Sequence, residues 1–141
     1  MHRAWARLRG GELTPRRAAL SVAVGLAIGV TPLWGTHWMI VLAVTLPLRL
    51  DAGLAFLASN VSLPFLAPFI TLAEIELGAW LLHGRWLPVD PRALRAAELR
   101  PLLAEIALGT ALVAAAFAAV GGALTLAVVR LRQRRRARGA P

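Results

Sequence analysis

The chain has 141 residues, of which 58% are hydrophobic and 16% are charged, and its mean hydropathy is +0.66. A soluble domain is about 45–50% apolar and about 25% charged, so this composition indicates a membrane protein. All 16 basic residues are arginine, and the formal net charge is +9. The sequence contains no cysteine, which excludes disulfides and thiolate chemistry.

Three long stretches contain neither arginine nor an acidic residue, namely 18–47, 52–73 and 106–129. A helix needs roughly 20 apolar residues to cross a bilayer core about 30 Å thick, and each stretch reaches that length. We therefore predict an all-α membrane protein with about four short or broken transmembrane helices, interrupted at proline and glycine. The whole chain, 1–141, is expected to form a single integral membrane domain.

The first stretch is divided by proline. Thr14 followed by proline is typical of a helix start, with an N-cap and a proline in the first turn. Thr31-Pro32 repeats this pattern, and proline disfavours a helical conformation in the residue before it. We expect helices over about 15–29 and 32–48. A helix of 16 residues spans only about 24 Å, so two thin crossings and one re-entrant hairpin both fit.

The remaining elements follow in the same way. Asp51 is expected to cap a helix that begins at Ala52, is interrupted at residues 60–64 and continues to about Leu82. A short amphipathic helix over 91–100 is predicted within a loop, 85–101. The last transmembrane helix is expected over 102–130, with a basic tail at 131–141. Its many glycine and alanine residues form a face that permits close helix packing, through which we expect a homodimer.

Arginine clusters at both ends of the chain predict the topology. Short flanking segments rich in arginine stay in the cytoplasm, so both termini are expected there, in the inner membrane, with an even number of crossings. The outer loop would then carry arginines that Asp90, Glu98 and Glu105 partly balance. The clusters are also expected to contact anionic lipid headgroups rather than nucleic acid, since no aromatic residue interleaves the tail. The arginines singled out for this role are Arg16, Arg17, Arg134, Arg135 and Arg136.

Two motifs resemble a known family. The run from Gly25 to Gly35, with the pattern G-x-x-x-G-x-x-P-x-[WF]-G, resembles the signature of the bacterial domain of unknown function 2062. The segment Asn60–Pro64, with Pro68 beyond it, is similar to the second element of that family. Val61 and Phe65 stand where many members have proline, which suggests a divergent subgroup. The resemblance covers about residues 14–84 and implies an integral membrane protein without an established activity. Members that look fused to or neighbouring glycosyltransferase or acyltransferase modules imply an envelope-lipid context.

The two helix breaks are the main candidates for a ligand site. Non-helical backbone at membrane depth is tolerated only where it is buried in protein or lines a watery cavity, and transporters bind anions at such helix starts. The alternative is that proline and glycine simply kink or end short helices. For the asparagine in the second break, we favour a structural role in bonding freed carbonyl groups. The residues of the two breaks are Thr31, Pro32 and Gly35, and Asn60, Ser62 and Pro64.

His37 and Glu74 are further candidates. His37 lies close to two tryptophans, so it could relay protons or bind phosphate, but an interfacial aromatic belt is the simpler interpretation. Glu74 and Glu76 are two residues apart and so point to different faces of a helix. Glu74 shares a face with Gly78 and is expected to point inward. An intramembrane carboxylate is a functional hypothesis by default, although water near the interface could also solvate it.

No catalytic constellation, metal-ligand spacing or cofactor motif occurs, so we expect neither an enzyme nor a bound cofactor. The sequence favours a scaffold or accessory subunit in envelope-lipid or glycoconjugate metabolism, with an enzyme of that metabolism as partner. The alternative is a transporter or flippase-like protein for an anionic lipid or a phosphate-bearing lipid carrier. A carrier needs water at the helix breaks, whereas a scaffold keeps them dry.

Overall fold

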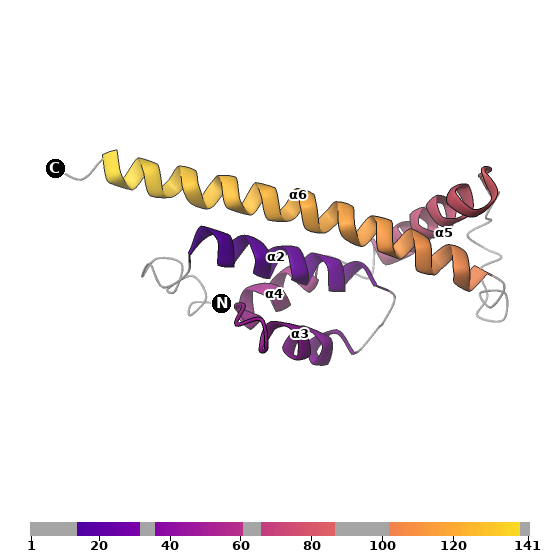
Figure 1. Ribbon diagram of the computed structural model, residues 1–141, viewed down its shortest axis with the longest axis horizontal. Helices are drawn as coiled ribbons and strands as arrows, with labels where there is room; N and C mark the ends of the chain where they lie inside the picture. The colour runs from indigo at the N-terminus through magenta and orange to yellow at the C-terminus, as the bar shows by residue number, and fades with distance from the viewer. Residues whose placement is uncertain (1–13, 32–35, 61–65, 87–101, 139–141) are drawn as a thin grey trace.

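The computed structural model describes residues 14–31, 36–60, 66–86 and 102–138, and these residues form five helices and no strand. The helix α6 runs along the whole molecule, with α2 beside one half of it and α5 crossing the other half (Figure 1). The shorter helices α3 and α4 lie against α2. The helix bounds are Pro15–Val30 for α2, His37–Thr45 for α3, Ala52–Ser59 for α4, Ala67–His83 for α5 and Leu103–Arg138 for α6.

Two of the predicted helix starts, at Pro15 and Ala52, are confirmed by their caps, whereas α3 begins at His37 and not at the expected residue 32. Thr14 Oγ1 accepts a hydrogen bond from the Arg17 N–H at 3.2 Å, with proline in the first turn of α2. Asp51 Oδ1 accepts one from the Leu54 N–H at 2.8 Å and so caps α4. The main-chain N–H of Asp51 also donates to Ser21 Oγ at 2.9 Å, which fixes the start of α4 against α2.

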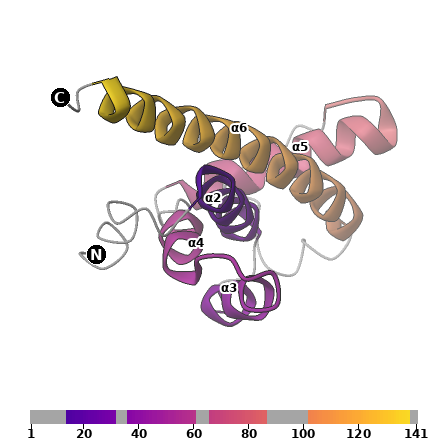
Figure 2. The same cartoon turned by 60° about the vertical axis from the view of Figure 1, so that its left-hand side comes forward.

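The helices α2 and α4 run in the same direction and pack backbone to backbone. A Cβ atom added at Gly25 would overlap the carbonyl oxygen of Ala55, and one at Gly29 would overlap that of Ser59. Small residues permit this close approach. The helix α3, which connects α2 to α4 in the sequence, packs against both of them. Figure 2 shows it beside α4, with α2 seen nearly end-on. Ile28, Val41 and Ala55 form the core that these three helices share.

Two helix ends differ from the sequence prediction. The helix α3 stops at Thr45 rather than near residue 48, and the chain turns through Arg49, whose φ is 52°. The helix α6 continues to Arg138 rather than ending near residue 130. Arginine, glutamine and alanine all have high helix propensity, so the basic segment extends the helix instead of forming a loose tail. The short helix expected over 91–100 lies outside the described residues.

Within the described parts of the chain, only α6 is long and apolar enough to cross a membrane, over Leu103–Arg135. Four transmembrane helices are therefore not confirmed. The helices α2 and α5 contain 16 and 17 residues. At 1.5 Å per residue they are about 24 and 26 Å long, which is less than the bilayer core of about 30 Å.

Little of the apolar part of α6 is fully buried, because only the side toward α2 and α5 is covered and much of that side is half-buried. Its large apolar side chains that face outward recur every three to five residues along the helix. They are Leu103, Leu108, Leu112, Phe117, Val120, Leu124, Val128 and Leu131. We call this set the outer face of α6. Because α5 and α2 pack against different sides of α6, the exposed apolar side chains point to different sides of the helix in its two halves. Exposed apolar surface of this extent is typical of a contact with lipid or with another protein.

Candidate functional site at the crossing of α5 and α6

The described polar groups beside the two breaks are bonded within their own helices. Thr31 Oγ1 donates to the carbonyl oxygen of Ile28 at 2.6 Å. Asn60 Nδ2 and Ser59 Oγ both donate to the carbonyl oxygen of Phe56, at 2.7 and 2.8 Å. The Asn60 amide thus bonds within its own helix, and its expected role in bonding the carbonyl groups freed by proline stays a prediction. The other candidates in the breaks, Pro32, Gly35, Ser62 and Pro64, lie outside the described residues.

The two helices that lead into the breaks end close together, because Gly29 of α2 contacts Ser59 of α4. On α6, Gly121 and Gly122 contact α2, while Gly109 contacts α5. Along α6, the ends of α2 and α4 therefore lie between the contact with α2 at Gly121 and Gly122 and the contact with α5 at Gly109. The glycines of α6 that we expected to join two copies of the chain are thus in contact with helices of the same chain.

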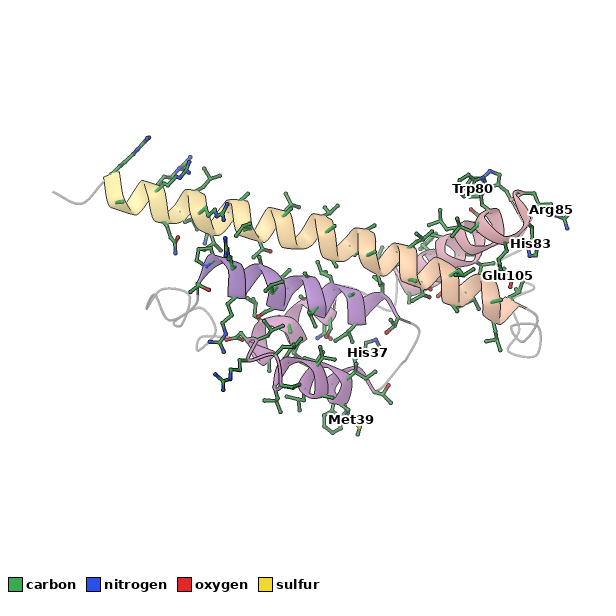
Figure 3. The ribbon with its side chains drawn as sticks, viewed as in Figure 1. His37, Met39, Trp80, His83, Arg85 and Glu105 are labelled. Atoms are coloured by element: carbon green, nitrogen blue, oxygen red, sulfur yellow. The ribbon has the colours of Figure 1, made fainter. Side chains whose placement is uncertain are left out.

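His37 and Glu74 are not brought together. His37 is the first residue of α3 and is half-buried. Figure 3 shows it on α3, apart from the end of the molecule where His83 and Glu105 lie. Glu74 lies on α5 and is 0% exposed, which agrees with the inward orientation predicted from its shared face with Gly78. Glu76, two residues further on, is half-buried.

The helices α5 and α6 cross in an antiparallel arrangement with reciprocal contacts. A Cβ atom at Gly78 would overlap the main-chain carbonyl oxygen of Glu105, and one at Gly109 would overlap that of Glu74. Each glycine thus faces the backbone of the glutamate on the other helix. The two backbones approach this closely because neither glycine carries a side chain at the contact.

Unpartnered polar atoms gather at this crossing. Both carboxyl oxygens of Glu74, Oε2 of Glu105 and Oγ1 of Thr110 are buried and have no hydrogen-bond partner among the residues that the structure describes. The Thr110 hydroxyl faces the Glu74 carboxyl from α6 without reaching hydrogen-bond geometry. Buried polar atoms are nearly always bonded in folded proteins, so this concentration marks the crossing as a candidate site.

The other oxygen of Glu105 connects the crossing to the end of the molecule. Its Oε1 lies 2.9 Å from Nε2 of His83, whose side chain is 44% exposed. Both residues lie at the same end of the molecule, near Trp80 and Arg85 (Figure 3). Trp80 and Trp86 stack there, with 6.4 Å between their ring centroids. The carboxyl group of Glu105 thus contacts the exposed His83 with one oxygen and lies within the buried crossing with the other.

Sequence analysis missed Glu105, which it treated as a loop charge that balances arginines. In the structure Glu105 is in the first turn of α6 and is buried against α5. A repeated segment would have identified it. Residues 73–78 and 104–109 share the pattern A-E-I-x-L-G, and this repeat supplies both glutamates and both glycines of the crossing.

The arginines gather at the opposite end. The helix α6 is antiparallel to α2, because Gly122 lies against Ala19 and Ala23 while Gly121 lies against Leu26. The start of α2 and the end of α6 therefore lie at the same end of the molecule (Figure 1). Of the predicted membrane-surface residues, Arg136 is placed only by its backbone within α6, and the exposed ones are Arg16, Arg17, Arg134 and Arg135.

No group of three or more histidine, cysteine or acidic side chains that could hold a metal ion occurs in the described segments. The family profile described as an uncharacterized protein conserved in bacteria, DUF2062, matches residues 1–138. Neither the curated proteins nor the solved structures contain a significant match to the chain.

Proposed function

The chain belongs to the DUF2062 family, and from this premise we propose that it is a multi-pass inner-membrane protein that serves as a scaffold or accessory subunit. Its partner would be an enzyme of envelope-lipid or glycoconjugate metabolism. The observation that carries this proposal is the outer face of α6, an exposed apolar surface along the longest helix of the molecule. Such a face can contact both lipid and the transmembrane helix of a partner.

The helix lengths support a re-entrant hairpin with two crossings. The helices α2 and α3, with 16 and 9 residues, lie beside only one half of α6. The helices α4 and α5 follow one another in the chain and together extend along the apolar length of α6. The helix α6 then runs back in the opposite direction. In this proposed arrangement the start of α2 and the end of α6 would lie together on the cytoplasmic side, as the positive-inside rule favours.

The bonding at the breaks favours a scaffold over a carrier. Thr31, Ser59 and Asn60 each donate to a carbonyl group of their own helix, so both hydroxyl donors and one of the two N–H donors of the Asn60 amide are already used. A site for an anionic headgroup needs donors that are directed toward the ligand. The arginine-rich end supplies cations for anionic headgroups at the membrane surface instead.

A carrier of an anionic lipid or a phosphate-bearing lipid is the second candidate. It is favoured by the contact between Gly29 and Ser59, which brings the ends of two short helices together inside the molecule. Transporters build substrate sites near the midplane of the bilayer from such interrupted helices. In this case the outer face of α6 would contact lipid alone.

Cysteine substitution at Asn60 distinguishes the two candidates, because the chain contains no natural cysteine. Asn60 is exposed on the protein surface, so a membrane-impermeant thiol reagent reports whether water or lipid covers it. A scaffold predicts no reaction from either side, whereas Arg85→Cys, at an exposed site beyond the end of α5, reacts and serves as the control. Reaction at position 60, together with transfer of a fluorescent anionic lipid between leaflets of reconstituted vesicles, would replace the scaffold by the carrier.

A further inference from the structure

We propose that Glu74 is a proton-binding site within the membrane, with its carboxyl group held in the acid form at the crossing of α5 and α6. The proposal concerns a different part of the molecule from the outer face of α6, and it does not depend on the scaffold function. It rests on the complete burial of Glu74, on its two unpartnered oxygens and on the groups that surround it.

Among the described residues, the parts of α5 and α6 that cross at Glu74 contain no permanent cation. Besides Glu74, the titratable groups there are Glu76 and His83 on α5 and Glu105 on α6, and the arginines of α6 begin only at Arg130. No arginine occurs in residues 66–84 or 102–129. His83 is the one group there that can become a cation, and it is already 2.9 Å from Glu105. A carboxylate at position 74 would therefore be a buried charge without a partner.

A buried charge without a partner costs several kcal/mol, and proteins avoid this cost by neutralising the group. A proton on Glu74 removes the charge and gives the carboxyl group an O–H donor. The Thr110 hydroxyl, which faces Glu74 and has no hydrogen-bond partner, can accept from that donor after a small side-chain rotation. Proton binding thus resolves two of the unpartnered groups at once.

The proton has a route from the end of the molecule. His83 is 44% exposed and contacts Oε1 of Glu105, whose Oε2 is buried and unpartnered. Glu74 and Glu105 are diagonal neighbours at the crossing, because each lies opposite a glycine one turn beyond the other glutamate. A proton from water can reach His83, then Glu105 and finally Glu74, and chains of this type carry protons in membrane proteins.

Release of the proton would act on the packing of the two helices. Gly78 and Gly109 hold the backbones in direct contact, and the Glu74 side chain beside them is 0% exposed. The charged form of Glu74 is therefore compatible only with a more open crossing. Proton binding and the closed arrangement of α5 and α6 stabilise each other, as linkage requires.

Dicyclohexylcarbodiimide tests the proposal, since this apolar reagent modifies protonated carboxyl groups in membranes. The full chain in lipid vesicles is treated over a series of pH values, and the modified residue is identified by mass spectrometry. We expect Glu74 to be modified near neutral pH, with less modification as the pH is raised because only the acid form reacts. Glu74→Gln should abolish this modification. The matched control Glu76→Gln, which changes a half-buried neighbour, should retain it.

Infrared difference spectroscopy provides a readout that does not require access of a reagent. Glu74→Gln has nearly the same shape as the parent side chain, and its fold is checked by circular dichroism and size exclusion. The difference spectrum between the parent protein and this variant should contain the carbonyl band of one carboxylic acid. A carboxylate band at that position in neutral buffer, or absence of modification at Glu74 with a normal fold, would overturn the proposal.

Discussion

Single glycines determine the distance between helices in this protein. Gly78 and Gly109 each face a main-chain carbonyl group across the crossing of α5 and α6. A carbonyl group belongs to the helix itself and cannot rotate away, in contrast to the end of a flexible side chain. A methyl group at either position must therefore separate the two helices.

We predict that Gly78→Ala and Gly109→Ala each lower the free energy of unfolding by about 1–3 kcal/mol, the usual cost of overpacking. Reversible unfolding in mixed detergent micelles measures the change. Gly53→Ala is the control, because a Cβ atom there would be 3.3 Å from the Asp51 side chain and would meet no backbone. Equal stability of all three variants would show that the crossing is looser than the structure indicates.

Residues whose role is local could be predicted from the sequence, and residues whose role depends on a distant partner could not. Thr14 and Asp51 were identified as caps because a cap bonds to an N–H three residues away. The carboxyl of Glu105 bonds to His83, which precedes it by 22 residues and belongs to another helix. Its charge suggested a loop, although the repeated A-E-I-x-L-G pattern contained the necessary information.

At the scale of helices, the contacts support the re-entrant hairpin that we propose over two thin crossings. A helix of 16 residues is shorter than the bilayer core, and α2 has its contacts on one half of α6. Sequence alone could not separate two thin crossings from a hairpin, because both have the same prolines and the same apolar pattern. The contacts of α2 with α4 and α6, which the sequence alone does not reveal, are what support the hairpin.

The re-entrant hairpin predicts that the chain between α2 and α3 does not reach the outer surface. In cells, Thr36→Cys at the start of α3 should not react with an impermeant thiol reagent added from outside, while Arg85→Cys should react. Both positions are exposed on the protein surface, so protein burial does not explain the difference. Labelling of position 36 from outside would instead establish four crossings.

At the scale of the whole molecule, charge is strongly polarised along the axis of α6. Most of the described arginines lie at the end where α2 begins and α6 finishes, whereas His83, Glu105 and Glu74 lie in the other half, together with Arg85. An arginine near an anionic membrane surface contributes about 1 kcal/mol to attraction. In the membrane protein that we propose, the basic end would therefore both orient the chain and attract anionic lipid.

We predict that the triple variant Arg134→Gln, Arg135→Gln and Arg138→Gln increases the fraction of molecules whose C-terminus lies outside the cytoplasm. A reporter fused to the C-terminus, active on only one side of the membrane, measures this fraction. The corresponding lysine variant keeps the charge and should behave as the parent chain does. An unchanged orientation in the glutamine variant would mean that the arginines near α2 suffice.

The contacts of α5 also have a consequence for the order of synthesis. Residues 15–59 contain α2, α3 and α4, which pack on one another and can assemble as soon as they leave the ribosome. The helix α5 has its principal contacts with α6, which is translated last. Glu74 therefore leaves the ribosome before Gly109 and Thr110 do. Biogenesis of this half of the protein is thus a late event, completed only when the final helix arrives.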